Sequence, residues 1–173
     1  LYIDIWNAID AAATKPFGFM SFYPCPGPGS HCIPVDPTYL SWKAEQTGIE
    51  TQFIDLANKI NRGMPEYVVQ QTVDLLNDRA VPVSTADVLI LGAAYKANVS
   101  DVREPPALDI IKLLSEKDAT VRYHDPYVPA LEICDERYES VPLETETVEM
   151  SDCVLIVTDH DTMDIKQVVT DAD

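Results

Sequence analysis

The chain has 173 residues, of which 29 are acidic and 12 are basic, so its formal net charge at neutral pH is −17. Such a charge argues against nucleic acid or an anionic membrane surface as a partner, because both are themselves negatively charged. Hydrophobic residues make up 46% of the chain, which argues against disorder, and no apolar run approaches the ~18 residues that a membrane span needs.

The first part of the chain predicts helices interrupted by one long loop. Residues 2–13 show apolar side chains at helical spacing without a start signal, and we expect that residues upstream are missing. Residues 14–37 form a loop rich in Pro, Gly and aromatic side chains, here named the Cys loop. Because its four aromatic side chains favour burial, we expect a packed binding loop. Helices are then expected from Asp36-Pro37 to Glu45, with Asp36 as the cap, and from about Thr51 to Asn77 with a joint at residues 63–65.

From residue 81 the pattern changes to alternating strands and helices. Strands are expected at residues 87–95, 119–125 and 152–160, and amphipathic helices at 106–118 and 164–169. This alternation predicts βαβ units and a parallel sheet. The sequence therefore predicts an α/β protein with a helical region over residues 1–80 and a Rossmann-like domain over residues 81–173. A further strand would normally complete such a sheet, so we expect both ends to be cut.

Cys32 is the first candidate functional residue. It precedes an expected helix start, where the helix N-terminus favours negative charge, and a thiolate there could attack an aldehyde or acyl carbon. The alternative is a small buried apolar side chain, as most cysteines are. His31 is not expected to pair with Cys32, because neighbouring side chains in an extended segment point apart. We interpret Asp36 mainly as a helix cap, whose second carboxylate oxygen could also hold a water molecule.

Lys96 and Arg103 are the second candidate feature. They follow the strand expected at residues 87–95, and ligands of parallel sheets bind at the carboxyl ends of the strands. Both side chains suit phosphate oxygens, whereas the alternative is a solvated basic turn. A complete Gly-x-Gly-x-x-Gly dinucleotide fingerprint is absent from the chain.

The cysteines and histidines indicate neither a disulfide framework nor a metal site. None of the four cysteines forms a Cys-x-x-Cys pair, and the three histidines complete no metal-binding spacing. We expect reduced thiols and a cytoplasmic protein. The acidity fits either an ordinary acidic cytosolic enzyme or a protein adapted to high salt.

The segment FYPCPGPGSHCIPVDPTYLSWKA, residues 22–44, resembles the cysteine-bearing loop of UDP-sugar 6-dehydrogenases in the UDP-glucose/GDP-mannose dehydrogenase family. Segments at residues 10–20, 60–69, 91–111 and 123–129 match the same family in the same order. The segment at 10–20 is most similar to UDP-N-acetylglucosamine 6-dehydrogenases, with the UDP-glucose and UDP-N-acetylmannosamine enzymes as close relatives. Cys25 and Ser30 stand where the family usually has Gly, Pro28 where Leu is common, and Pro105 where Ser is usual, which we read as variation.

The resemblance implies an NAD-dependent, two-step oxidation of the C6 alcohol of a UDP-sugar and a homodimer formed through the central helical region. It implies that Cys32 is the nucleophile and that Asp36 helps to position a water. It further implies UDP-sugar contacts from Lys15, Phe22, Tyr23, Gly27, Gly29 and Lys96, and an NAD contact from Arg103. The main NAD-binding domain of such enzymes would lie upstream of this chain.

Two other functions remain as alternatives. One is a non-catalytic dimerisation and UDP-binding module, which the isolated chain could form without the NAD domain. The other is a cysteine hydrolase, which would need His124 or His160 as the partner of the thiol.

Overall fold

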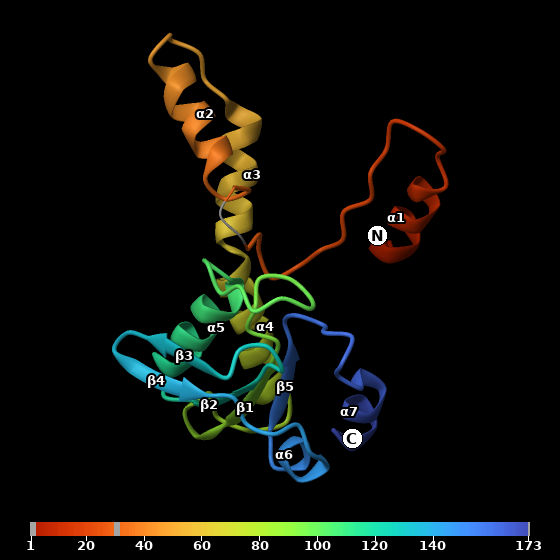
Figure 1. Cartoon of the computed structure of the whole chain (residues 1–173), viewed down its shortest axis with the longest axis vertical. Coiled ribbons are helices and arrows are strands. Elements are labelled where there is room, and N and C mark those ends of the chain that lie inside the picture. The colour runs from red at the N-terminus through yellow and green to blue at the C-terminus, as the bar shows by residue number, and fades with distance from the viewer. Residues whose placement is uncertain (1–2, 30–31, 173) are drawn as a thin grey trace.

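The computed structural model describes residues 3–29 and 32–172 and has a helical part that projects from an α/β body (Figure 1). The projecting part contains α1 (Ile5–Ala13), α2 (Asp36–Glu45) and α3 (Gln52–Arg62). A fourth helix, α4 (Met64–Asp78), continues from α3 into the body. Among the described residues, no helix is both long and apolar enough to cross a membrane.

The body is built on a parallel three-stranded sheet in the order β2-β1-β5. The central strand β1 (Asp87–Leu91) pairs on one side with β2 (Thr120–His124) and on the other with β5 (Cys153–Ile156). Helix α5 (Pro106–Ser115) connects β1 to β2, which makes a βαβ unit. The predicted α/β class with a parallel sheet is therefore confirmed.

Both faces of the sheet are covered by helices, which explains why β1 is apolar from Val88 to Leu91. Val88 and Ile90 belong to the core that the sheet forms with α4 and α5. Leu89 and Leu91 belong to a second core with α6 (Thr145–Glu149) and α7 (Ile165–Asp171). All four side chains are fully buried. A strand that alternates between two buried faces has no position for a polar side chain.

The structure corrects two predicted helix starts. Helix α1 does have a start signal, because the Asp4 side chain accepts hydrogen bonds from the backbone N–H groups of Trp6 and Asn7. Asp36 is not the cap of α2: Val35 occupies that position and Asp36 is the first helical residue, with no side-chain cap bond. The carboxylate of Asp36 still lies in the first turn, where the helix dipole favours negative charge.

A β-hairpin between β2 and α6 was not predicted. It consists of β3 (Ala130–Ile133) and β4 (Glu136–Glu139), paired antiparallel. Cys134 and Asp135 form the two-residue turn, and both have left-handed backbone angles, φ 51° and 67°. Hairpin turns of this kind usually carry Asn or Gly, so the sequence Cys-Asp gave no recognisable turn signal.

Gly92 ends β1 and permits a close approach between two strand ends. Its φ is +83°, and a Cβ added there would overlap the backbone oxygen and Cβ of Thr158, which follows β5. Gly48, just after α2, has a similar φ of +79° but has open space around a built Cβ. Both glycines therefore have a left-handed backbone, but only Gly92 lacks space for a side chain.

We predict that Gly92→Ala lowers the free energy of unfolding by about 3 kcal/mol, whereas Gly48→Ala lowers it by about 1 kcal/mol. The left-handed backbone accounts for the smaller cost, and the overlap with Thr158 adds the remainder. Urea unfolding followed by far-ultraviolet circular dichroism measures both values. Equal losses in the two variants would contradict the close approach.

Candidate functional site

Two glycines of the Cys loop, Gly27 and Gly29, lie against the α/β body and the end of α3. A Cβ added to Gly29 would overlap the Tyr95 side chain, so the loop backbone contacts Tyr95 with no space for a side chain. A Cβ added to Gly27, whose φ is +141°, would lie 3.3 Å from the backbone oxygen of Asn61 and 3.4 Å from Pro106. These two glycines therefore bring the loop against the segment that follows β1.

The Asn61 oxygen that lies near Gly27 belongs to the joint between α3 and α4. The joint predicted at residues 63–65 is confirmed: Gly63 separates the two helices, and Pro65 follows in the first turn of α4. Proline has no N–H group, so Pro65 cannot supply the usual helical hydrogen bond to the carbonyl four residues earlier, which is that of Asn61.

Cys32 is exposed, so the interpretation as a buried apolar side chain is wrong. Its carbonyl oxygen accepts hydrogen bonds from the N–H groups of Val35, at 3.2 Å, and Asp36, at 2.8 Å. These bonds form the turn that leads into α2 and keep the thiol-bearing residue next to the first turn of the helix. The expectation for His31 concerns a residue outside the described part of the chain, as does that for Ser30.

Lys96 and Arg103 both lie on the loop between β1 and α5, residues 92–105, here named the basic loop. The Arg103 side chain is 66% exposed and donates from Nε and Nη2 to the carboxylate of Asp101. Its pKa is raised, chiefly by the hydrogen bonds to Asp101 and by the charge of that carboxylate, with smaller electrostatic contributions from Tyr95 and Cys32.

Asp125 is a buried carboxylate at the carboxyl end of β2 that the sequence analysis did not single out. It is 2% exposed and accepts hydrogen bonds from four backbone N–H groups, those of Ala93, Ala94, Tyr127 and Val128. Burial raises its pKa, but the backbone hydrogen bonds and the nearby His160 outweigh burial, so the pKa lies below its ordinary value. Its position after a strand of a parallel sheet was a usable signal.

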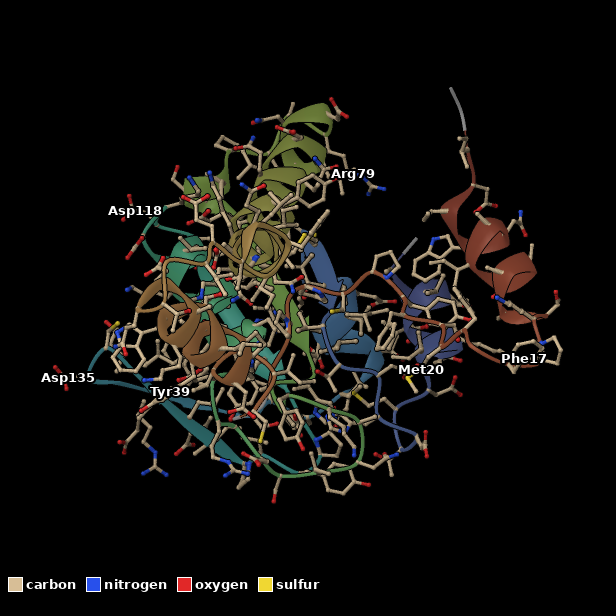
Figure 2. All side chains as sticks on the ribbon, turned by 90° about the horizontal axis from the view of Figure 1, so that it is seen from above. Phe17, Met20, Tyr39, Arg79, Asp118 and Asp135 are labelled. Carbon is tan, nitrogen blue, oxygen red and sulfur yellow. The ribbon has the colours of Figure 1, made fainter. Side chains whose placement is uncertain are left out.

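The N-terminal half of the Cys loop, residues 14–24, here named the arm, does not join this site (Figure 2). The expectation of a packed loop is wrong within the described chain, because Phe17 and Phe22 are both 76% exposed. Tyr23 stacks on Trp6 of α1 and donates a hydrogen bond to Asp10, which raises the pKa of Tyr23. The Lys15 ammonium lies 5.8 Å from the centre of the ring of Phe17, which Figure 2 shows beside α1.

Neither histidine considered for a hydrolase is arranged as a base for Cys32. His160 is fully buried, and both of its ring nitrogens have hydrogen-bond partners in the sheet domain. His124 has its Nδ1 2.7 Å from the carbonyl oxygen of Val141. Within the described residues, neither His124 nor His160 is hydrogen-bonded to the thiol of Cys32.

A cavity of about 980 Å³ adjoins the Cys loop on its helical side. Its walls include five prolines and two aromatic side chains, among them Pro28, Trp42 and Pro106. Cys32, Lys96 and Arg103 do not line it. We therefore centre the candidate site on the thiol and the basic loop rather than on this cavity.

We predict that Asp125→Asn lowers the free energy of unfolding at neutral pH by about 3 kcal/mol. The NH2 group of the amide would face backbone N–H groups and could not accept their hydrogen bonds. Ionised Asp125, with its lowered pKa, stabilises the fold above the unfolded-state value of about 3.9. That contribution is lost as the pH falls through the lower folded-state pKa.

Denaturant unfolding of the wild type and Asp125→Asn from about pH 7 to about pH 3 measures this difference, which should shrink below about pH 4. Asp135→Asn, at the exposed tip of the hairpin, is the control and should match the wild type throughout. A difference that stays constant over the whole range would show that the ionised carboxylate is not the stabilising group.

Two domain models of one family match the chain. The UDP-binding domain of the UDP-glucose/GDP-mannose dehydrogenase family matches residues 89–171, and the central domain of that family matches residues 1–63. A UDP-N-acetyl-D-mannosamine dehydrogenase of Methanococcus maripaludis is 35% identical over 161 residues, which are 92% of this chain and 34% of the relative. A UDP-N-acetyl-D-glucosamine 6-dehydrogenase of Pseudomonas aeruginosa is 35% identical over 158 residues, 91% of this chain and 37% of the relative.

The fold agrees with these sequence relationships. A UDP-D-ManNAc dehydrogenase from Pyrococcus horikoshii matches with a TM-score of 0.80 at 27% identity, covering 98% of this chain and 38% of that chain. The chain spans about a third of the length of the curated relatives it matches. It belongs to the UDP-glucose/GDP-mannose dehydrogenase family.

Proposed function

We propose that this chain is the central and UDP-binding portion of an NAD-dependent UDP-sugar 6-dehydrogenase, which oxidises the C6 alcohol of the sugar to a carboxylate. The observation that carries the proposal is the contact of Gly29 with Tyr95. Through it, the loop with the exposed Cys32 lies on the loop with Lys96 and Arg103. A nucleophile and two cations then share the carboxyl edge of a parallel sheet, where ligands of such folds bind.

The basic loop supplies the charge that a diphosphate requires. Lys96 is exposed, and its ammonium group suits the diphosphate oxygens of a UDP-sugar. Arg103 is paired with Asp101, so Lys96 is the cation of this loop that we assign to the diphosphate. Gly27 and Gly29 let the backbone of the Cys loop pass close to the bound sugar and diphosphate. Phe22, Tyr23 and Lys15 belong to the same proposed set, on an arm that would have to close over the substrate or reach that of a second subunit.

Cys32 carries the covalent step in this proposal. After the first oxidation has produced the C6 aldehyde, the thiolate adds to the aldehyde carbon and forms a thiohemiacetal. Loss of a hydride from that carbon gives a thioester. Water then attacks the thioester, the C–S bond breaks, and the carboxylate and the free thiolate are released. Asp36 lies in the helical turn beside Cys32 and would accept a hydrogen bond from the attacking water.

NAD would accept the two hydrides, and this chain supplies one side of its site. The exposed guanidinium of Arg103 fits a contact to a dinucleotide phosphate, because its planar group carries five N–H donors. The chain contains no Gly-x-Gly-x-x-Gly fingerprint, so the rest of the cofactor site has to come from outside it. What this chain contributes is therefore the thiol, the water-positioning carboxylate and the substrate cations.

For the sugar, we favour UDP-N-acetylglucosamine over UDP-N-acetylmannosamine and UDP-glucose. The support is the similarity of residues 10–20 to the UDP-N-acetylglucosamine enzymes. Relatives named for the glucosamine and the mannosamine substrate are equally similar to the chain, at 35% identity. The N-acetyl group is the shared feature of both, which supports a UDP-N-acetylhexosamine.

We also propose a homodimer formed through the helical region. Helix α1 has no buried residue over Ile5–Ala13, and α3 has none over Gln52–Arg62. Phe53, Leu56 and Ile60 of α3 are spaced to form one helical face, and all are more than half exposed. Apolar surface of this extent marks an interaction site. The aromatic side chains of the arm would gain the burial that they lack here at such an interface.

A cytoplasmic location is part of the proposal. All four cysteines are free, and Cys25, Cys32 and Cys134 are exposed. Exposed free thiols persist in a reducing compartment, and the proposed reaction requires the thiol of Cys32 to stay reduced.

We predict that Cys32→Ser in the complete enzyme lowers the rate of uronic acid formation from UDP-N-acetylglucosamine at least about 1,000-fold, because the weaker nucleophile blocks the second oxidation. The aldehyde-stage intermediate should remain bound and be detectable by mass spectrometry. Cys134→Ser, at the exposed hairpin turn, is the matched control and should retain wild-type kcat. Undiminished acid formation by Cys32→Ser would overturn the assignment.

A further inference from the structure

Three segments of the chain meet at the carboxyl edge of the sheet around His160. Its Nδ1 accepts a hydrogen bond from the backbone N–H of Asn98 at 2.9 Å. That nitrogen therefore has a lone pair, so the ring proton is on Nε2, which donates to Asp125 at 3.0 Å. A neutral His160, fully buried, thus joins the loop after β5 to the basic loop after β1 and to the end of β2.

Further hydrogen bonds fasten the same stretch of the basic loop. The Asn98 side chain donates to the Asp161 carboxylate at 2.8 Å and accepts from the Asp161 N–H at 3.1 Å. Asn98 itself is left-handed, with φ 63°. At the other end of the stretch, Thr158 donates to the carbonyl of Ala94 at 2.7 Å. Residues 93–98 are therefore held at both ends by groups outside their own loop.

Tyr95 and Lys96 lie between these two fixed points. Tyr95 is the residue on which Gly29 of the Cys loop packs, and Lys96 is the exposed cation proposed for the diphosphate. Neither His160 nor Asp125 can contact a ligand directly, because both are buried and their polar atoms bond within the protein. His160 and Asp125 can therefore affect substrate binding only through residues 93–98, which they hold in place.

We propose that Asp125 and His160 are positioning residues that fix Lys96 for the substrate's diphosphate, so that they set the affinity for UDP and UDP-sugar rather than the rate of the chemical step. This inference rests on the proposed function for the assignment of Lys96 to the diphosphate. Beyond that function, Asp125 after β2 and His160 after β5 determine the position of Lys96 on the loop after β1.

The test uses His160→Leu, which fills the space but removes both ring nitrogens, and His160→Gln, which keeps one donor and one acceptor. His160→Leu should raise KM for the UDP-sugar and the Kd for UDP, measured by calorimetry, about tenfold, with kcat changed less than about twofold. His160→Gln should recover most of the loss. Val148→Ala, in the core on the α6–α7 side of the sheet, controls for lost stability and should leave KM and Kd unchanged.

A double-mutant cycle with Lys96→Ala decides whether the effect passes through Lys96. In that background, His160→Leu should raise the Kd for UDP less than about twofold. An equal rise in both backgrounds, or an unchanged Kd in the single variant, would overturn the proposal. If His160→Leu does not fold, Asp125→Asn, which disturbs the hydrogen bonds to Ala93, Ala94 and His160, takes its place, and an unchanged Kd there would also overturn the proposal.

The two proposals fail in distinguishable ways. Binding of UDP without oxidation of any UDP-sugar by the complete enzyme would contradict the proposed function, while the Kd values still decide the role of His160. Oxidation with unchanged KM and Kd in His160→Leu would contradict only the present inference. Absence of UDP binding to the wild type would overturn both.

Discussion

The carboxylate of Asp125 is the interaction on which the arrangement of the site depends. It is nearly completely buried, and it accepts hydrogen bonds from segments that follow all three strands of the sheet. A buried charge is tolerated only when its hydrogen-bonding capacity is filled, so these segments cannot move independently without a large energetic cost. Because the basic loop is one of them, its residues Ala93 and Ala94 are held to the ends of the strands. The Cys loop then packs on that fixed surface through Gly29.

The proposed site therefore has two parts: one that contacts inside the chain hold in place, here called the rigid half, and the arm, which does not contact it in the described part of the chain. The basic loop and the second half of the Cys loop are positioned by contacts inside the chain, at Tyr95 and at the joint between α3 and α4. The arm with Phe22 and Tyr23 is positioned by α1 and presents aromatic side chains to solvent. A substrate bound at the rigid half would meet the cations and the thiol. Closure around the sugar would require surfaces from a second subunit or from the remainder of the enzyme, and this fits a chain that spans about a third of its relatives.

The sequence predicted the elements whose signals are local and missed those set by distant contacts. The strand over β1 and the joint at Gly63 were predicted, because apolar runs and Gly-Met-Pro act over a few residues. The basic loop was placed at the carboxyl edge by the general rule for parallel sheets. Asp125 and His160 were missed as a pair, since the hydrogen bonds that join them to each other and to the loop after β1 span 31 to 62 residues of the chain. The aromatic side chains of the arm were predicted to be buried, but the described chain offers no surface that covers them. The division of the chain into a helical region over residues 1–80 and a Rossmann-like domain over residues 81–173 stays a prediction.

In the proposed enzyme, the Cys loop and the basic loop form one UDP-sugar site with Cys32 at its surface. Alkylation of this chain by iodoacetamide, quantified for each cysteine peptide by mass spectrometry with and without a UDP-sugar, tests it most directly. Cys32 and Cys134 are both exposed, so both should react in the absence of ligand. The account predicts that millimolar UDP-N-acetylglucosamine slows alkylation of Cys32 and leaves Cys134 unaffected. An unchanged rate at Cys32 would contradict it.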